Sequence, residues 1–189
     1  MNKQLGQHFL INKSAIKKIV AGLDLKSGET IIEIGPGAGA LTFPLLEECK
    51  KVGCKLIVIE KDRGLAAELI GREEKNIKII WGDAPKELLG LAPKFSLNSN
   101  YKIVGNIPYY ITGKLLRILS ELENKPEVSV LMLQKEVAER ISAKPPKNNL
   151  LAAAVQFWAE PKILFTLKQS DFNPPPEVNS AVIQLTTKQ

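Results

Sequence analysis

The segment TIIEIGPGAGALTFPLLEE, residues 30–48, carries the strongest structural signal in the chain. A short β-branched run comes first, a glycine cluster follows, and apolar residues at helical spacing close the segment. This order predicts a strand, a tight turn and a helix. The segment is therefore interpreted as the first strand-turn-helix unit of an α/β fold.

The same alternation of strand and helix continues after this segment. Further strands are predicted over residues 55–62, 76–83, 101–110 and 128–136, with helices over 62–74 and 113–122. An earlier amphipathic helix begins behind Asn12, with Ile16, Ile19 and Leu23 on its apolar face. The nearly continuous apolar strands are typical of a parallel sheet that is covered on both faces.

The last third of the chain has a different pattern. It predicts a helix over 148–161, a strand over 162–168, a proline-rich connection over 170–179 and a final strand over 180–187. Two closing strands joined by a loop favour an antiparallel pair at the sheet edge. The predicted fold is thus a single α/β domain with a doubly wound, mostly parallel seven-stranded sheet.

Composition excludes several classes of protein. The chain has 189 residues, which is enough for one core, and it has two cysteines and one histidine. These numbers argue against a disulfide scaffold, a zinc site and a Cys-His nucleophile pair. No run approaches the roughly 20 apolar residues of a membrane helix, and no signal peptide is recognisable. We expect a soluble, cytoplasmic protein without a membrane partner.

Residues at predicted strand ends suggest a cofactor site, because ligands of such sheets bind at the carboxyl ends of the strands. Gly35 and Gly37 form a G-x-G-x-G turn after the first strand, where the backbone can approach a ligand closely. Glu60 ends the second strand, where a carboxylate can accept both ribose hydroxyls. Asp83 follows the third strand and can accept a hydrogen bond from an adenine amine. Together they indicate an S-adenosylmethionine site.

Asn-Ile-Pro-Tyr, residues 106–109, closes the fourth predicted strand and indicates a site for the target base. The Asn106 side-chain oxygen and the Pro108 carbonyl can hold the two hydrogens of an adenine amine, which favours a pyramidal nitrogen with its lone pair directed at a methyl group. Tyr109 offers a face for base stacking. Phe172 is a candidate for the opposite face, or an ordinary core residue. No strong general base is visible, and methyl transfer from a sulfonium needs none.

These motifs resemble those of the ribosomal RNA adenine dimethyltransferases that modify two adjacent adenosines near the 3′ end of small-subunit rRNA. The resemblance runs in order through GQHFL, EIGPGAGALT, VIEKD, GDA, GNIPYYIT, MLQKEVAERI and FNPPPEVNSAV. It implies S-adenosylmethionine-dependent N6-dimethylation by a Rossmann-like methyltransferase domain, coupled to small-subunit biogenesis. The cofactor residues that it implies are His8, Leu10, Gly35, Glu60, Asp83 and Asn106.

The resemblance also implies domain organisation and partners. We expect one catalytic domain over residues 1–189, in which residues 1–12 form a flexible segment over the cofactor. Family members usually continue into a small helical carboxyl-terminal domain, whereas this chain stops nine residues after Ser180. The expected partner is small-subunit rRNA, within the small ribosomal subunit or its precursor. We expect a monomer and no metal.

The net charge of +6 fits a polyanionic partner. Phosphate contacts are expected from Lys13, Lys17 and Lys18, with Arg117, Arg140 and Lys147 as further candidates.

Three alternatives stay open at this point. A large-subunit rRNA adenine methyltransferase that confers macrolide resistance shares the cofactor site and the Asn-x-Pro-Tyr chemistry. A non-catalytic ribosome assembly factor can keep the fold, but we would expect its cofactor acids or Asn106 to have decayed. A nicotinamide-dependent oxidoreductase is disfavoured by the glycine spacing, which is not G-x-G-x-x-G.

Overall fold

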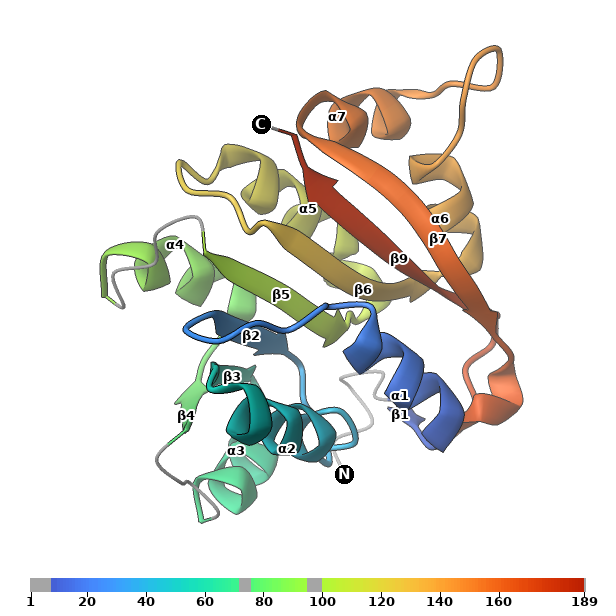
Figure 1. Ribbon diagram of the computed structural model, residues 1–189. Coiled ribbons are helices and arrows are strands. Elements are labelled where there is room, and N and C mark those ends of the chain that lie inside the picture. The colour runs from blue at the N-terminus through green and yellow to red at the C-terminus, as the bar shows by residue number, and fades with distance from the viewer. Residues whose placement is uncertain (1–7, 72–75, 95–99, 189) are drawn as a thin grey trace.

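The computed structural model of the chain describes residues 8–71, 76–94 and 100–188. A seven-stranded sheet with the order β4-β3-β2-β5-β6-β9-β7 forms the middle layer (Figure 1). Its strands are β2 (Thr30–Ile34), β3 (Lys55–Glu60), β4 (Ile77–Trp81), β5 (Tyr101–Asn106), β6 (Val128–Gln134), β7 (Ala159–Leu167) and β9 (Ser180–Thr187). The predicted doubly wound α/β sheet is confirmed.

Strand direction divides the sheet into two parts. Strands β2 to β6 pair in parallel, whereas β9 lies antiparallel to both β6 and β7. The predicted antiparallel pair at the edge is therefore confirmed, with β9 inserted between β6 and the edge strand β7. The chain runs outward from β2 to β4, then returns to β5 on the other side of β2. The strand order thus reverses between β2 and β5, where such folds bind ligands.

Seven α-helices of the described residues cover the two faces of the sheet. They are α1 (Lys13–Ala21), α2 (Thr42–Val52), α3 (Arg63–Ile70), α4 (Ala84–Lys94), α5 (Thr112–Glu121), α6 (Lys135–Ile141) and α7 (Leu150–Trp158). Buried residues of α1, α2 and α3 share one apolar cluster, and those of α4 to α7 share another. Ile31 joins the first cluster and Ile32 the second, as side-chain alternation along a strand requires. The fold is a three-layer α/β/α sandwich.

Some element boundaries differ from the sequence-based expectations. Helix α4 contains two prolines and a glycine, which obscured its helical pattern. Strand β6 ends at Gln134, and the next residues begin α6 instead of extending the strand. Helix α7 ends at Trp158, so Pro161 lies in β7, where an edge strand tolerates proline.

A second, two-stranded sheet was not expected from the sequence. Strand β1 (Phe9–Leu10) pairs antiparallel with β8 (Phe172–Asn173). The chain between His8 and Asn12, here called the amino-terminal strap, is held there by further hydrogen bonds, although we expected residues 1–12 to be flexible. Residues 1–7 of that expected segment lie outside the described residues. Two short 3₁₀ turns, η2 (Tyr109–Ile111) and η3 (Gln169–Asp171), adjoin β5 and β8.

Cys49 and Cys54 form a disulfide between the end of α2 and the start of β3. The sequence argues against a fold held together by disulfides, and this one link joins residues only five positions apart. Among the helices of the described residues, none is long and apolar enough to span a bilayer.

Glycine at position 105 permits the close pairing of β5 with β2. A Cβ atom there would meet the carbonyl oxygen of Ile34, and it would lie 3.1 Å from the Ile34 Cβ. We predict that Gly105→Ala lowers the free energy of unfolding by about 1–3 kcal/mol, as overpacking does. Gly113→Ala is the matched control, because a Cβ at this position of α5 would meet no atom within 4 Å. Urea denaturation of both variants checks this, and equal midpoints would contradict it.

Candidate active site

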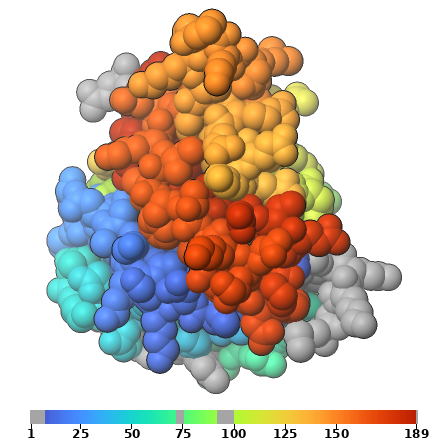
Figure 2. Space-filling view, turned by 90° about the vertical axis from the view of Figure 1, so that its right-hand side faces the viewer, coloured from blue at the N-terminus to red at the C-terminus, as the bar shows by residue number. Residues whose placement is uncertain are grey.

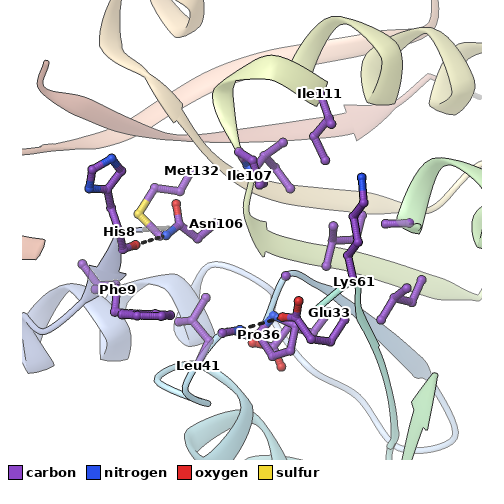
Figure 3. Close-up of a pocket in the computed structure, with 18 of the residues that line it drawn as sticks. His8, Phe9, Glu33, Pro36, Leu41, Lys61, Asn106, Ile107, Ile111 and Met132 are labelled. Atoms are coloured by element: carbon purple, nitrogen blue, oxygen red, sulfur yellow. Dashed lines mark hydrogen bonds between the residues drawn. The ribbon is translucent and has the colours of Figure 1, made fainter. Parts of the chain in front are cut away.

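The residues predicted to bind cofactor and base converge at the point where the strand order reverses. Ile34 and Gly105 are register partners in β2 and β5, so the chain segments that follow these strands leave the sheet side by side. A pocket opens there (Figure 3). All ten predicted site residues line it, namely His8, Leu10, Gly35, Gly37, Glu60, Asp83, Asn106, Pro108, Tyr109 and Phe172.

The glycine turn after β2 is shaped for close approach. Gly37 has a φ of 57°, in the left-handed region that favours glycine. A Cβ atom on Gly37 would lie 2.6 Å from Cε1 of the Phe9 ring. The turn therefore requires glycine both for its backbone conformation and for the space that Phe9 occupies.

Glu60 links the end of β3 to this turn. Its Oε2 accepts a hydrogen bond from the Gly37 amide at 3.1 Å, and its Oε1 accepts one from the Asp62 amide at 2.7 Å. Burial raises the pKa of the Glu60 carboxyl, and the amides of Asp62 and Gly37 oppose the rise. Each carboxylate oxygen has a further acceptor position. The Glu60 carboxylate is thus held by two backbone amides, and it can still accept hydrogen bonds from hydroxyl groups.

Asp83 lies at the open side of the pocket, after β4. Its carboxylate pairs with Lys61 Nζ at 3.4 Å and with Lys114 Nζ at 4.0 Å. The sequence did not single out either lysine. Lys61 also lies over the ring of Tyr110, at 5.9 Å from the ring centre. Two cations, one directly after β3 and one in α5, therefore lie beside the acid that we expect to face an adenine amine.

Asn106 ends β5, and its carboxamide is oriented by the amino-terminal strap. Its Nδ2 donates a hydrogen bond to the His8 carbonyl oxygen at 2.7 Å (Figure 3). Nearby, the Pro108 carbonyl accepts a hydrogen bond from Ile111, which closes η2. A carbonyl oxygen has two lone pairs, so the Pro108 carbonyl can accept one more hydrogen bond.

Two aromatic residues border the same part of the pocket. The Tyr109 hydroxyl lies 3.2 Å from Ser180 Oγ, which ties the Tyr109 side chain to the start of β9. Phe172 is buried among the residues that α1 and α2 cover and also lines the pocket. It is therefore both a core residue and a pocket residue, which joins the two interpretations that the sequence left open.

Glu33 is a site residue that the sequence reasoning missed. Its side chain is buried in β2, and neither carboxyl oxygen has a hydrogen-bond partner among the described residues. The neighbouring Thr42 hydroxyl is equally unpartnered. Burial raises the Glu33 pKa to about 8, and the charge of Glu60 adds to this rise. An acid inside an apolar strand was the available signal.

The structure does not bring all the candidate phosphate-binding cations together. Lys13, Lys17 and Lys18 project from α1, on one face of the sheet. Arg117 and Arg140 belong to α5 and α6, which cover the other face. Arg117 also pairs with Glu121 at 2.8 Å. The basic residues of α1 and those of the opposite face are thus separate groups.

Comparison with known proteins identifies the family. The ribosomal RNA adenine dimethylase family matches residues 1–189. The chain belongs to this family. In this member of the family, the glycine turn follows β2, the first strand of the parallel sheet.

Curated relatives extend beyond the segment that this chain matches. The chain is 40% identical to ribosomal RNA small subunit methyltransferase A of Dehalococcoides mccartyi, over 99% of this chain and 63% of that protein. It is 37% identical to a dimethyladenosine transferase of Schizosaccharomyces pombe, over 99% and 59%. The chain therefore spans about three fifths of these relatives' length.

Solved structures with the same fold include a dimethyladenosine transferase from Plasmodium falciparum. It superposes with a TM-score of 0.83 at 30% identity, covering 96% of this chain and 64% of that chain. The 23S rRNA methyltransferase ErmE has a TM-score of 0.79 at 23% identity, covering 95% and 70%. The second likeness shows the fold alone. In the part of the chain that the structure describes, no cluster of His, Cys, Asp or Glu could hold a metal ion.

The buried Glu33 carboxyl makes stability depend on pH. Its folded-state pKa of about 8 lies above the ordinary value of 4.5, so the folded protein binds this proton more tightly than the unfolded chain does. The resulting stabilisation is complete below the ordinary pKa and is lost as the pH rises through the folded value. We predict that the free energy of unfolding falls more steeply between about pH 5 and 8 in the wild type than in Glu33→Gln.

Chemical denaturation across this pH range measures the difference between the two proteins. Glu68→Gln, at an exposed position of α3, controls for loss of a negative charge. Parallel pH profiles for wild type and Glu33→Gln would show that Glu33 does not titrate as predicted.

Proposed function

We propose that this chain is an S-adenosylmethionine-dependent rRNA (adenine-N6,N6)-dimethyltransferase that acts on two adjacent adenosines near the 3′ end of small-subunit (16S) rRNA. One observation carries the proposal. The glycine turn with Glu60, and Asn106 with Pro108 and Tyr109, line a single pocket at the reversal of strand order. Family membership supports the same activity.

The residues of the pocket fit S-adenosylmethionine. Gly37 leaves its turn without a side chain, and Glu60 is fixed by two backbone amides. The Glu33 carboxyl in β2 and the Thr42 hydroxyl at the start of α2, on either side of this turn, are buried and have no hydrogen-bond partner among the described residues. Residues Gly35, Gly37, Glu60 and Asp83 would hold the cofactor, with His8 and Leu10 of the strap over it. When bound, the cofactor supplies an activated methyl group on a sulfonium.

Four other residues of the pocket hold the target base. The Asn106 side-chain oxygen and the Pro108 carbonyl accept the two amine protons, because an amine nitrogen whose protons are held apart can direct its lone pair outward. Tyr109 and Phe172 offer apolar faces on opposite sides of the base. Alignment of this kind is worth about 7–11 kcal/mol of a barrier in well-oriented reactions, so no strong base is needed.

The proposed partner is small-subunit rRNA, within the small ribosomal subunit or its precursor, met in the cytoplasm by a monomer of this protein. An adenine that enters the pocket must leave its stack, so an unpaired or flexible RNA segment suits the site. The exposed α1 lysines supply phosphate contacts, and binding should weaken steeply with salt.

The experiment that tests this function follows methyl transfer directly. Labelled S-adenosylmethionine is incubated with under-methylated small subunits, with large subunits and free rRNA in parallel, and nucleosides are then analysed. Dimethyladenosine in small-subunit rRNA is the expected result. Label in large-subunit rRNA would instead assign the resistance-type activity. Cofactor binding without transfer to any RNA would contradict the proposal and favour an assembly factor.

Two variants separate the proposed roles within the pocket. Glu60→Gln should weaken cofactor binding about ten- to hundredfold, because hydrogen bonds to a charged acceptor are lost. Asn106→Ala should lower kcat about a hundredfold or more, as loss of a positioned polar group does, with a smaller effect on cofactor binding. Calorimetric titration and single-turnover assays measure the two effects. Equal losses of binding and turnover in both variants would refute the division of roles.

A further inference from the structure

The hydrogen bond between the strap and Asn106 is compatible with one orientation of the carboxamide. A carboxamide has a donor end and an acceptor end. As the chain stands, Nδ2 faces the His8 carbonyl oxygen at 2.7 Å, and the side-chain oxygen points away from the strap (Figure 3). A half-turn of the amide would place two acceptor oxygens against each other with no proton between them. The His8 carbonyl therefore determines which end of Asn106 faces the pocket.

The position of that carbonyl is fixed by the chain around β8. His8 Nδ1 lies 2.9 Å from the Pro174 carbonyl oxygen, and β1 pairs with β8 directly after it. The Ile11 amide donates to the Asp171 carbonyl at 2.8 Å. Figure 2 shows the amino-terminal region (blue) and the chain around residues 165–180 (orange-red) adjoining on one face. The strap is thus anchored to the segment that carries Phe172.

The strap also rests on the cofactor turn. The Phe9 ring occupies the space beside Gly37 that a Cβ atom would need. Leu10 is buried between α1 and α2, and both Phe9 and Leu10 line the pocket. One short segment therefore contacts the glycine turn, the Asn106 carboxamide and the Phe172 segment at once.

We propose that His8 is a positioning residue for the target base: its carbonyl oxygen selects the Asn106 orientation in which the side-chain oxygen can accept an amine proton. The proposal rests on the proposed methyl-transfer function and deepens it. The strap then does more than cover a cofactor, because it determines whether the Asn106 carboxamide presents its oxygen or its nitrogen to the base. In the reversed orientation, Asn106 would present its Nδ2 donor to the adenine amine, which is also a donor.

The first test needs neither cofactor nor RNA. Asn106→Asp replaces the donor by an oxygen, so the carboxylate repels the His8 carbonyl. Hydrogen–deuterium exchange of residues 8–12 should accelerate in this variant. Asp83→Asn is the matched control, since it exchanges acid for amide in the same pocket away from the strap, and its strap should exchange as in the wild type. Unchanged exchange in Asn106→Asp would overturn the proposal.

The second test separates positioning from cofactor contact. His8→Ala removes the side-chain contact with Pro174 and leaves the backbone carbonyl poorly held. We expect kcat for small-subunit methylation to fall about tenfold, as small misplacements of reacting groups do, with a smaller loss of affinity for S-adenosylhomocysteine. His8→Asn, which keeps a side-chain donor, should restore most of the rate.

Equal losses in Kd and kcat would make His8 a cofactor contact only and would overturn the proposal. Wild-type protein without methyl-transfer activity would instead refute the proposed function, and the exchange measurement would still decide whether the strap orients Asn106.

Discussion

The in-register parallel pairing of β2 with β5 is the constraint on which the site depends. It lets two chain segments from distant parts of the sequence leave the sheet together, one as the glycine turn and the other as Asn-Ile-Pro-Tyr. Gly105 makes this pairing close, because any side chain there would meet the Ile34 carbonyl. The backbone pairing of β2 with β5 therefore places the two segments that line the pocket next to each other, independently of the polar contacts between them.

Electrostatics within the pocket follows from the same arrangement. Glu33 and Glu60 end or nearly end neighbouring strands, and both are buried, so both have raised pKa values. Glu60 is stabilised by backbone amides, whereas the Glu33 carboxyl has no hydrogen-bond partner within the described part of the chain. Asp83, on the more open side, is matched by two lysines. The three acids thus differ in burial and in the partners that surround them.

Much of this structure could be predicted from the sequence, because buried parallel strands and glycine turns leave strong local patterns. The seven strands of the main sheet, the antiparallel edge pair and the strand-end residues Glu60, Asp83 and Asn106 followed from such patterns, whereas His8 and Leu10 followed from the family resemblance. Contacts between distant segments leave no such pattern. The pairing of β1 with β8 and the bond from Asn106 to the His8 carbonyl are of this kind, since a backbone acceptor carries no sequence signature. Glu33 escaped notice because an acid in a buried strand looks like a strand-end residue until its burial is known.

The antiparallel course of β9 has a consequence for how such a site can diversify. Its first residue, Ser180, reaches the carboxyl edge of the parallel strands and contacts Tyr109. The pocket residues that we propose for the cofactor thus come mainly from residues 33–83, and those that we propose for the base come from residues 106–172. Under these proposed roles, substitutions in the later part would change the contacts to the base and leave most contacts to the methyl donor unaltered. The short strap at the amino terminus contacts both parts, through Phe9 beside Gly37 and through the His8 carbonyl at Asn106.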